Sequence, residues 1–204
     1  MPFATEQENF WAGAFGDEYT RRNQGQEVVA ANTALFARIL ARLPKVDSAV
    51  ELGANIGMNL LALRRLLPQA RLAAVEINDS AVAELRRIEG VEVTVGSLFD
   101  YAPAAPADLA LIKGVLIHIA PERLPDAYAA LYRSSARYLC LAEYYNPSPV
   151  EVPYRGHSGR LFKRDFAGEL LDRYGDLRLV DYGFVWRRDV FAQDDLTWFV
   201  LEKL

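Results

Sequence analysis

The feature that most constrains this 204-residue chain is a glycine-containing stretch, Glu51-Leu-Gly53-Ala-Asn55-Ile-Gly57-Met-Asn59, which directly follows a short apolar run. The glycines allow a tight turn and the close approach of a ligand to the backbone. The helix expected to begin at Asn59 offers N–H groups that have no partner within the helix. This arrangement is typical of a nucleotide-binding loop between the first strand and the first helix of a βαβ unit.

Short apolar runs alternate with helix-like stretches along most of the chain. We expect strands at residues 49–52, 72–77, 91–95, 109–112, 138–142, 177–184 and 196–201, and helices at 26–43, 59–67, 80–88, 121–133 and 166–174. Asn78 or Asp79 and Asp165 are placed to cap two of these helices, and Gly175 to end the last one. The alternation predicts an α/β fold with a Rossmann-like, doubly wound and mostly parallel seven-stranded sheet. Because no helix separates the last two runs, they are expected to form an antiparallel C-terminal hairpin.

The composition is that of one globular domain covering residues 1–204. Hydrophobic residues make up 51% of the chain and charged residues 25%, and the net charge is −4. The charge disfavours nucleic acid as a partner and favours small molecules. Without a signal peptide or a run of about 18 apolar residues, we expect a cytoplasmic protein that does not span a membrane. The oligomeric state is left open.

The cysteine and the possible metal-ligating residues indicate neither a reactive thiol nor a metal site. Cys140 lies inside an apolar run, so we interpret it as a packing residue. The sequence has no clustered His and Cys spacing, and the pair Asp194-Asp195 is interpreted as a surface feature, so no metal is predicted.

An acidic residue follows the glycine loop at the distance expected of a nucleoside site. The second expected strand ends near Glu76, nineteen positions after Gly57, where a carboxylate can accept hydrogen bonds from both hydroxyls of a ribose. The dinucleotide fingerprint G-x-G-x-x-G fails from Gly53 onward, because Asn55 and Met58 occupy its other glycine positions. The loop and its acid therefore indicate a nucleoside ligand and disfavour NAD. A solvated strand-end role for Glu76 is the alternative.

The same stretch resembles the E-x-G-x-x-x-G pattern of class I S-adenosylmethionine-dependent methyltransferases. The middle glycine common in those enzymes is Asn55 here, a residue type that tolerates left-handed backbone. The resemblance implies S-adenosyl-L-methionine as cofactor and S-adenosyl-L-homocysteine as product. It places Glu51, Gly53, Ala54, Asn55 and Gly57 in the cofactor loop, Glu76 and Ile77 at the ribose, Ser97 and Leu98 beside the adenine, and Lys113 and Gly114 near the reactive sulfonium. For Leu98 and its neighbour Phe99, a core role is the alternative.

Longer stretches resemble one family in particular, the pseudaminic acid biosynthesis-associated methylases. Besides the glycine loop they comprise residues 9–23, 113–119, 142–157, 161–168, 181–184 and 193–199, so that the resemblance spans nearly the whole chain. It implies a substrate in bacterial surface-sugar metabolism, such as a free or nucleotide-activated nonulosonic acid or its amino-sugar precursor.

Two segments outside the expected sheet are rich in aromatic and charged residues. Residues 1–25 are expected to form a lid over the cofactor, in which Tyr19 contacts the cofactor and Arg22 pairs with its carboxylate; anchoring to the core is the alternative. Residues 26–204 form the expected core, with a substrate loop at 144–164. We expect this loop to bind the substrate, because aromatic rings pack on a sugar and cations bind an acid. Its candidate residues are Tyr144, Tyr145, Asn146, Tyr154, Arg155, His157, Arg160 and Lys163. A solvated surface loop is the alternative.

Methyl transfer to an oxygen or nitrogen atom benefits from a base that accepts the departing proton. His118, just past the fourth expected strand, is the first candidate, with a structural or capping role as the alternative. Glu143, at the end of the fifth, is the second, with a strand-end ion pair as the alternative. The sequence thus predicts a small-molecule methyltransferase acting on a sugar-like acceptor. An NAD-linked sugar oxidoreductase, a non-catalytic S-adenosylmethionine-binding module and a macromolecular acceptor are the competing hypotheses.

Overall fold

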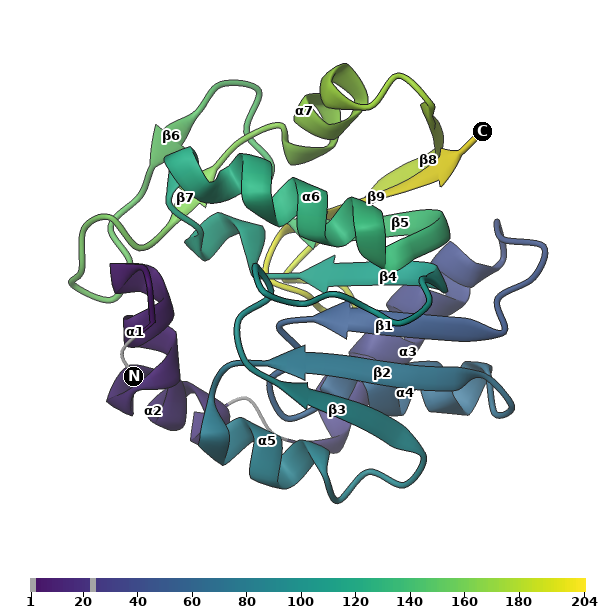
Figure 1. The fold of residues 1–204 in the computed structure, drawn as a ribbon, viewed down its shortest axis with the longest axis horizontal. Coiled ribbons are helices and arrows are strands. Elements are labelled where there is room, and N and C mark those ends of the chain that lie inside the picture. Colours follow the sequence, from purple (N-terminus) through teal and green to yellow (C-terminus); the bar gives the residue numbers. More distant parts are fainter. Residues whose placement is uncertain (1–2, 23–24) are drawn as a thin grey trace.

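A computed structural model of the chain describes residues 3–22 and 25–204. Its centre is a seven-stranded sheet with the strand order β3-β2-β1-β4-β5-β9-β8 (Figure 1). The strands are β1 (Ser48–Leu52), β2 (Arg71–Glu76), β3 (Val91–Val95), β4 (Ala107–Lys113), β5 (Ser135–Glu143), β8 (Leu177–Val185) and β9 (Leu196–Lys203). The first five strands pair in parallel, and β9 is antiparallel to both β5 and β8. The predicted Rossmann-like sheet and its antiparallel hairpin are confirmed.

The five expected helices are present as α3 (Gln26–Leu40), α4 (Met58–Leu66), α5 (Asp79–Leu85), α6 (Leu124–Ser134) and α7 (Phe166–Arg173). Asn78 caps α5, because its side chain accepts a hydrogen bond from Ala81 N. Asp165 caps α7 through Gly168 N. The expected helix at 121–133 is divided: Pro121–Arg123 form a 3₁₀ turn before α6 begins.

Two apolar clusters cover the two faces of the sheet. Phe36 and Ile39 of α3 and Leu63 of α4 belong to one cluster, and Leu131 of α6 and Leu170 of α7 belong to the other. Figure 1 shows α3 and α4 behind the sheet and α6 and α7 in front of it. Strand β1 is buried along its whole length, as expected for a central parallel strand covered on both faces.

The N-terminal segment forms two short helices, α1 (Glu6–Ala12) and α2 (Ala14–Arg22). Thr5 and Glu8 form a capping box at the start of α1. Gly16 allows the two helices to meet closely, because a Cβ atom there would lie 1.9 Å from the carbonyl oxygen of Trp11. Asn23, which we expected to belong to the lid, lies outside the described residues, as do Met1, Pro2 and Gln24.

The expected long loop contains a two-stranded antiparallel sheet of β6 (Val150–Glu151) and β7 (Phe162–Lys163). Helix α1 lies beside this loop in Figure 1, at the end of the sheet where the parallel strands terminate. Gln7 Nε2 donates to the carbonyl of Gly159 at 3.4 Å, which joins the two segments. Among the described residues, every helix is too short or too polar to cross a membrane.

Candidate functional site

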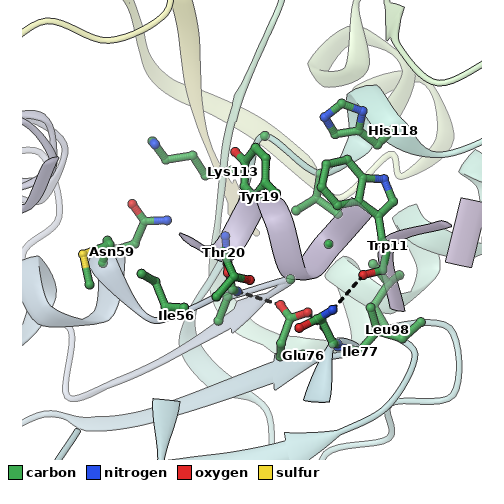
Figure 2. A pocket seen from close by; sticks show the side chains of 18 of the residues that line it. Trp11, Tyr19, Thr20, Ile56, Asn59, Glu76, Ile77, Leu98, Lys113 and His118 are labelled. Carbon is green, nitrogen blue, oxygen red and sulfur yellow. Dashed lines mark hydrogen bonds between the residues drawn. The ribbon is translucent and has the colours of Figure 1, made fainter. Parts of the chain in front are cut away.

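A cavity of about 790 Å³ lies at the carboxyl ends of the parallel strands, beneath α1 and α2 (Figure 2). Open α/β sheets bind ligands at this edge, and small-molecule pockets measure about 300–1,000 Å³. The residues after β1, β2, β3 and β4 all contribute to its wall, together with α3 and the connection between β8 and β9. The cavity is therefore large enough for a nucleoside-containing ligand with room beside it.

The glycine loop has the backbone that its sequence requires. Gly53 and Gly57 have φ values of +77° and +81°, and Asn55 adopts +48°, so the residue replacing the usual glycine is left-handed as well. A Cβ atom on Gly57 would lie 2.4 Å from Ile88 Cδ1. Gly57 does not line the cavity; it permits the loop to pack against the segment after α5. Gly53, Ala54 and Asn55 do line it.

Glu76 is a buried carboxylate in the cavity wall. Its Oε2 accepts a hydrogen bond from Asn55 N at 2.6 Å, and its Oε1 accepts from Ile77 N at 2.9 Å and Asn78 N at 2.8 Å. Burial raises the pKa of Glu76, and these backbone N–H groups oppose that shift. The second strand therefore ends in a carboxylate whose position is set by the glycine loop.

Glu51, Asn59 and Lys113 form what we call the polar end of the cavity. Asn59 and Lys113 line the cavity, whereas Glu51 is fully buried just behind the wall. Asn59 Nδ2 donates to Glu51 Oε1 at 2.5 Å, while Glu51 Oε2 and Asn59 Oδ1 are buried with no hydrogen-bond partner among the described residues. Burial raises the pKa of Glu51 to about 8, so its carboxyl group is mostly protonated near pH 7. A buried carboxyl oxygen and a buried amide oxygen thus lack partners, a costly arrangement unless a ligand supplies them.

Lys113 is the cation of the polar end. Burial lowers the pKa of its ammonium, and the carboxylates of Glu51, Glu143 and Asp194 oppose this shift. Figure 2 shows the Lys113 side chain extending toward Asn59, with Tyr19 on its other side. A cation in this position suits an anionic group of a bound ligand.

His118 lines the cavity next to the lid. Its Nδ1 lies 2.6 Å from the carbonyl oxygen of Arg160, and because a carbonyl only accepts, Nδ1 carries the hydrogen. Nε2 is then the unprotonated nitrogen, and burial lowers the pKa of His118 to about 4. The imidazole is therefore neutral near pH 7 and able to accept a proton at Nε2.

Glu143 has a different position from His118. It does not line the cavity; its Oε1 accepts hydrogen bonds of 3.0 Å from both Val115 N and Leu116 N. Burial raises the pKa of Glu143 to about 7, and the backbone N–H groups oppose that shift. Glu143 thus holds the 3₁₀ turn Leu116–His118, which carries the imidazole.

The end of the cavity away from Lys113 is more apolar. Ile77, Ser97, Leu98 and Phe99 line it, so both residues for which a core role was the alternative reach the cavity while also packing against the core. The Arg123 guanidinium lies 4.3 Å from the centroid of the Phe99 ring. This end suits a planar, partly apolar group.

The structure brings most of the predicted cofactor residues into one wall. The lining includes Tyr19, Gly53, Ala54, Asn55, Glu76, Ile77, Ser97, Leu98, Lys113 and Gly114, together with His118. Arg22 does not line the cavity: its Nη1 pairs with Glu18 at 2.9 Å along α2. The same guanidinium lies 5.9 Å from the centroid of the Phe15 ring.

None of the predicted substrate residues lines the cavity directly. The residues concerned are Tyr144, Tyr145, Asn146, Tyr154, Arg155, His157, Arg160 and Lys163. The rings of Tyr154 and His157 instead pack on the lid, with centroid distances of 6.0 Å from Phe15 to Tyr154 and 5.2 Å from Phe10 to His157. Tyr154 also lies 5.0 Å from the His118 ring, and Trp11 lies 4.6 Å from it. The loop therefore supports the lid and the imidazole.

Sequence reasoning missed several lining residues. They include Thr5, Glu8, Val28, Ala31, Asn32, Asn59, Arg123, Val190, Phe191, Gln193 and Asp194. Those on α3 face the cavity because the helix starts beside the glycine loop, and nothing in the periodicity marks that. Among the described residues, no group of three His, Cys, Asp or Glu side chains is arranged to hold a metal ion.

Comparison with known proteins finds similarity in fold. No family model matches the sequence. No curated protein matches it either. Among solved structures, the chain is similar to the Burkholderia thailandensis 1,6-didemethyltoxoflavin-N1-methyltransferase with bound S-adenosylhomocysteine, with 17% identity over 100% of this chain and 92% of that one (TM-score 0.71). A Leishmania major SAM-dependent methyltransferase gives 18% identity, with 98% and 87% covered (TM-score 0.71). A SAM-bound amino pentose methyltransferase from Micromonospora echinaspora gives 13%, with 93% and 96% covered (TM-score 0.65). The fold is thus that of the class I methyltransferases.

Proposed function

We propose that the protein is an S-adenosylmethionine-dependent methyltransferase acting on an oxygen or nitrogen atom of a small polar metabolite. The observation that carries the proposal is a single cavity with two chemically different ends. A carboxylate suited to a ribose and an adjoining apolar end lie on one side, and the polar end, with two buried oxygens that have no partner among the described residues, lies on the other. A nucleoside joined to an amino acid has the same two kinds of group.

The polar end fits the amino-acid part of this cofactor. An α-ammonium donates hydrogen bonds, and Glu51 Oε2 and Asn59 Oδ1 are the buried oxygens that have no partner among the described residues. The positive charge of the ammonium would also favour the ionised form of Glu51. An α-carboxylate accepts them, and Lys113 is the neighbouring ammonium. In this proposal Lys113 takes the role that Arg22 was expected to have.

The glycine loop is poorly suited to a pyrophosphate, which disfavours the NAD-linked alternative. Gly53 N and Ala54 N already donate to the carbonyl of Val75 at 2.8 and 3.1 Å, and Asn55 N donates to Glu76. A dinucleotide loop needs free N–H groups to approach the phosphates. S-adenosylmethionine has no phosphate and requires none of them.

When bound, the cofactor supplies an electrophilic methyl group on a sulfonium. The chain's own residues then orient the reacting groups, enclose them and accept a proton. Glu76 and the polar end fix the two ends of the cofactor, and such positioning is worth roughly 7–11 kcal/mol of a barrier in favourable cases. Trp11 and Tyr19 of the lid exclude water from above. His118 Nε2 accepts the proton that the acceptor loses, in a turn held by Glu143.

The family resemblance in the sequence supports a sugar-like acceptor, such as a free or activated nonulosonic acid or its amino-sugar precursor. Three of the solved neighbours carry acceptors of related polarity in their names: the amino pentose, the glycopeptide and the mitomycin methyltransferases. The loop at 144–164 contributes to acceptor binding in this proposal through Tyr144 and Tyr154, which lie next to the cavity wall. A sensor that binds the cofactor without transferring its methyl group is the remaining alternative.

Titration with two related ligands tests the proposed site. S-adenosylhomocysteine carries the amino-acid group, and 5′-methylthioadenosine lacks it. Replacing Lys113 with methionine should weaken S-adenosylhomocysteine by about 1.5–3 kcal/mol, the value of a charge-assisted hydrogen bond, and leave 5′-methylthioadenosine unchanged. Lys45→Met, at an exposed ion pair, is the control. Equal losses for both ligands would show that Lys113 does not recognise the amino-acid group.

A further inference from the structure

The side chain of Arg160 packs on the lid helix α1. Its guanidinium lies 5.0 Å from the centroid of the Phe10 ring, and its Nη1 lies 3.4 Å from Glu6 Oε2. Only 14% of the side chain is exposed, and its Nε is buried with no hydrogen-bond partner among the described residues. Because Glu6 is 82% exposed and surface ion pairs contribute little, the Phe10 ring is the main contact of the guanidinium.

The backbone carbonyl of Arg160 bonds to the imidazole of His118. Arg160 O lies 2.6 Å from His118 Nδ1, so the hydrogen bond that selects the tautomer comes from this residue. On one side of the carbonyl the chain is anchored in the core, because Leu161 is buried in the apolar cluster of α6 and α7. On the other side, Gly159 bonds to the exposed Glu151 and to α1. The carbonyl is thus held from the core and from the lid together.

Helix α1 also contacts the imidazole directly. Trp11 follows Phe10 on this helix, and its ring centroid lies 4.6 Å from that of His118. Figure 2 shows the two rings next to each other at the edge of the cavity. The Tyr154 ring lies 5.0 Å from the imidazole as well. One helix therefore packs on the imidazole through Trp11 and, through Phe10, on the residue that bonds to Nδ1.

Resting on the proposed function, in which His118 is the base, we propose that Arg160 is a positioning residue that links the lid to this base. With the guanidinium packed on Phe10, the carbonyl accepts from Nδ1–H and leaves the lone pair of Nε2 free. The acceptor's proton then bonds to Nε2, which makes an imidazolium whose Nδ1–H still donates to Arg160 O. The proton leaves to water when the lid opens.

Displacement of α1 has the opposite effect on the imidazole. The guanidinium loses the Phe10 ring, the carbonyl is held from the core alone, and Trp11 no longer covers His118. The imidazole then takes either tautomer, and the one with hydrogen on Nε2 cannot accept a proton there. The base is therefore assembled only beneath the closed lid, where the reacting groups are shielded from water.

The nitrogen-15 resonances of the imidazole report the tautomer without any ligand. The chain has two histidines, and His157→Gln assigns their signals. At a pH of about 8.5, about two units above the ordinary histidine pKa of about 6.5, the ring of His118 is neutral. We expect an N–H type of resonance at Nδ1 and a lone-pair type at Nε2. In Arg160→Met, both resonances should move toward the average of the two tautomers.

A variant on the other side of the contact tests the link to the lid. Phe10→Ala removes the ring beneath the guanidinium and leaves the loop unaltered, so it should move the two His118 resonances in the same direction as Arg160→Met. Arg187→Met is the matched control, because Arg187 belongs to another connection and pairs with an exposed carboxylate, that of Asp195, at 3.2 Å. Its spectrum should be that of the wild type.

Three results would overturn the proposal. The first is a wild-type His118 with its hydrogen on Nε2, and the second is an Arg160→Met variant with unchanged resonances, even if its melting temperature falls. The third is an unchanged tautomer in Phe10→Ala, which would show that Arg160 acts without the lid. Failure of the wild-type protein to bind S-adenosylhomocysteine would instead overturn the proposed function, and it would not alter these resonances.

Discussion

His118 is the residue whose environment makes the sharpest chemical prediction. Burial lowers its pKa to about 4, and Arg160 holds the tautomer that leaves Nε2 unprotonated. His118→Ala should lower turnover by about 10²–10⁴, the usual contribution of a general base, with little change in cofactor affinity. The ratio of wild-type to variant turnover should stay constant from pH 8 to pH 5, because the base is protonated only below that range. A ratio that falls through pH 6.5 would indicate an ordinary imidazole, and a fully active variant would eliminate the base.

At the level of single residues, the sequence predicts groups whose backbone position determines their role. Gly53, Asn55 and Glu76 could be placed because strand ends and left-handed turns leave a signature in spacing and residue type. Arg22 could not, because an ion pair one helical turn away with Glu18 competes for its guanidinium. Glu143 is a similar case: its residue type suggests a base, but only the fold reveals that its carboxylate accepts hydrogen bonds from two backbone N–H groups.

The two lid helices form the element with the clearest dynamic consequence. They are attached by polar contacts, in which Asn78 Nδ2 donates to Trp11 O at 3.2 Å and Ser80 Oγ to Asp17 Oδ1 at 2.7 Å, and by aromatic rings that pack on Tyr154 and His157. Trp11 itself contacts Tyr19 and His118. The described residues of α1 and α2 belong to neither apolar cluster of the core, and an element outside the core opens more easily than the sheet.

Trp11→Ala should therefore act on ligand release more than on global stability. We expect the dissociation rate of S-adenosylhomocysteine, measured by stopped-flow displacement, to rise about tenfold or more, the equivalent of about 1.4 kcal/mol, because the cover over the cavity loses its central ring. The melting temperature should change by only a few degrees. Tyr182→Ala, an equivalent truncation of an exposed ring on β8, should change neither quantity. An unaltered dissociation rate in Trp11→Ala would contradict the lid.

At the level of elements, the sequence predicts the strands and helices that apolar periodicity and capping residues mark. The seven apolar runs all fall in strands of the sheet, and Asn78 and Asp165 cap the helices assigned to them. The loop at 144–164 resisted prediction for a physical reason: its rings suggest a ligand, yet those of Tyr154 and His157 pack on Phe15 and Phe10 of a lid 130 or more positions away. Long-range packing of this kind leaves no local pattern.

For the whole molecule, the sheet order brings segments from across the chain to one edge. The end of β4 carries Lys113, the end of β2 carries Glu76, and the β8–β9 connection carries Asp194. The alternation of strands and helices predicts the fold class, but it does not by itself predict the strand order β3-β2-β1-β4-β5-β9-β8. Which residues of α3 and of the hairpin meet the glycine loop depends on tertiary packing, and these are the lining residues that sequence reasoning missed.

The central claim is that this cavity binds S-adenosylmethionine, and calorimetric titration with S-adenosylmethionine, S-adenosylhomocysteine and NAD tests it most directly. We predict saturable binding of the two adenosyl ligands and none of NAD. Glu76→Ala should weaken that binding by about 1–3 kcal/mol, because the groups that its carboxylate pairs with in the complex lose their partner. Binding of NAD alone, or adenosyl affinity unaffected by Glu76→Ala, would contradict the account.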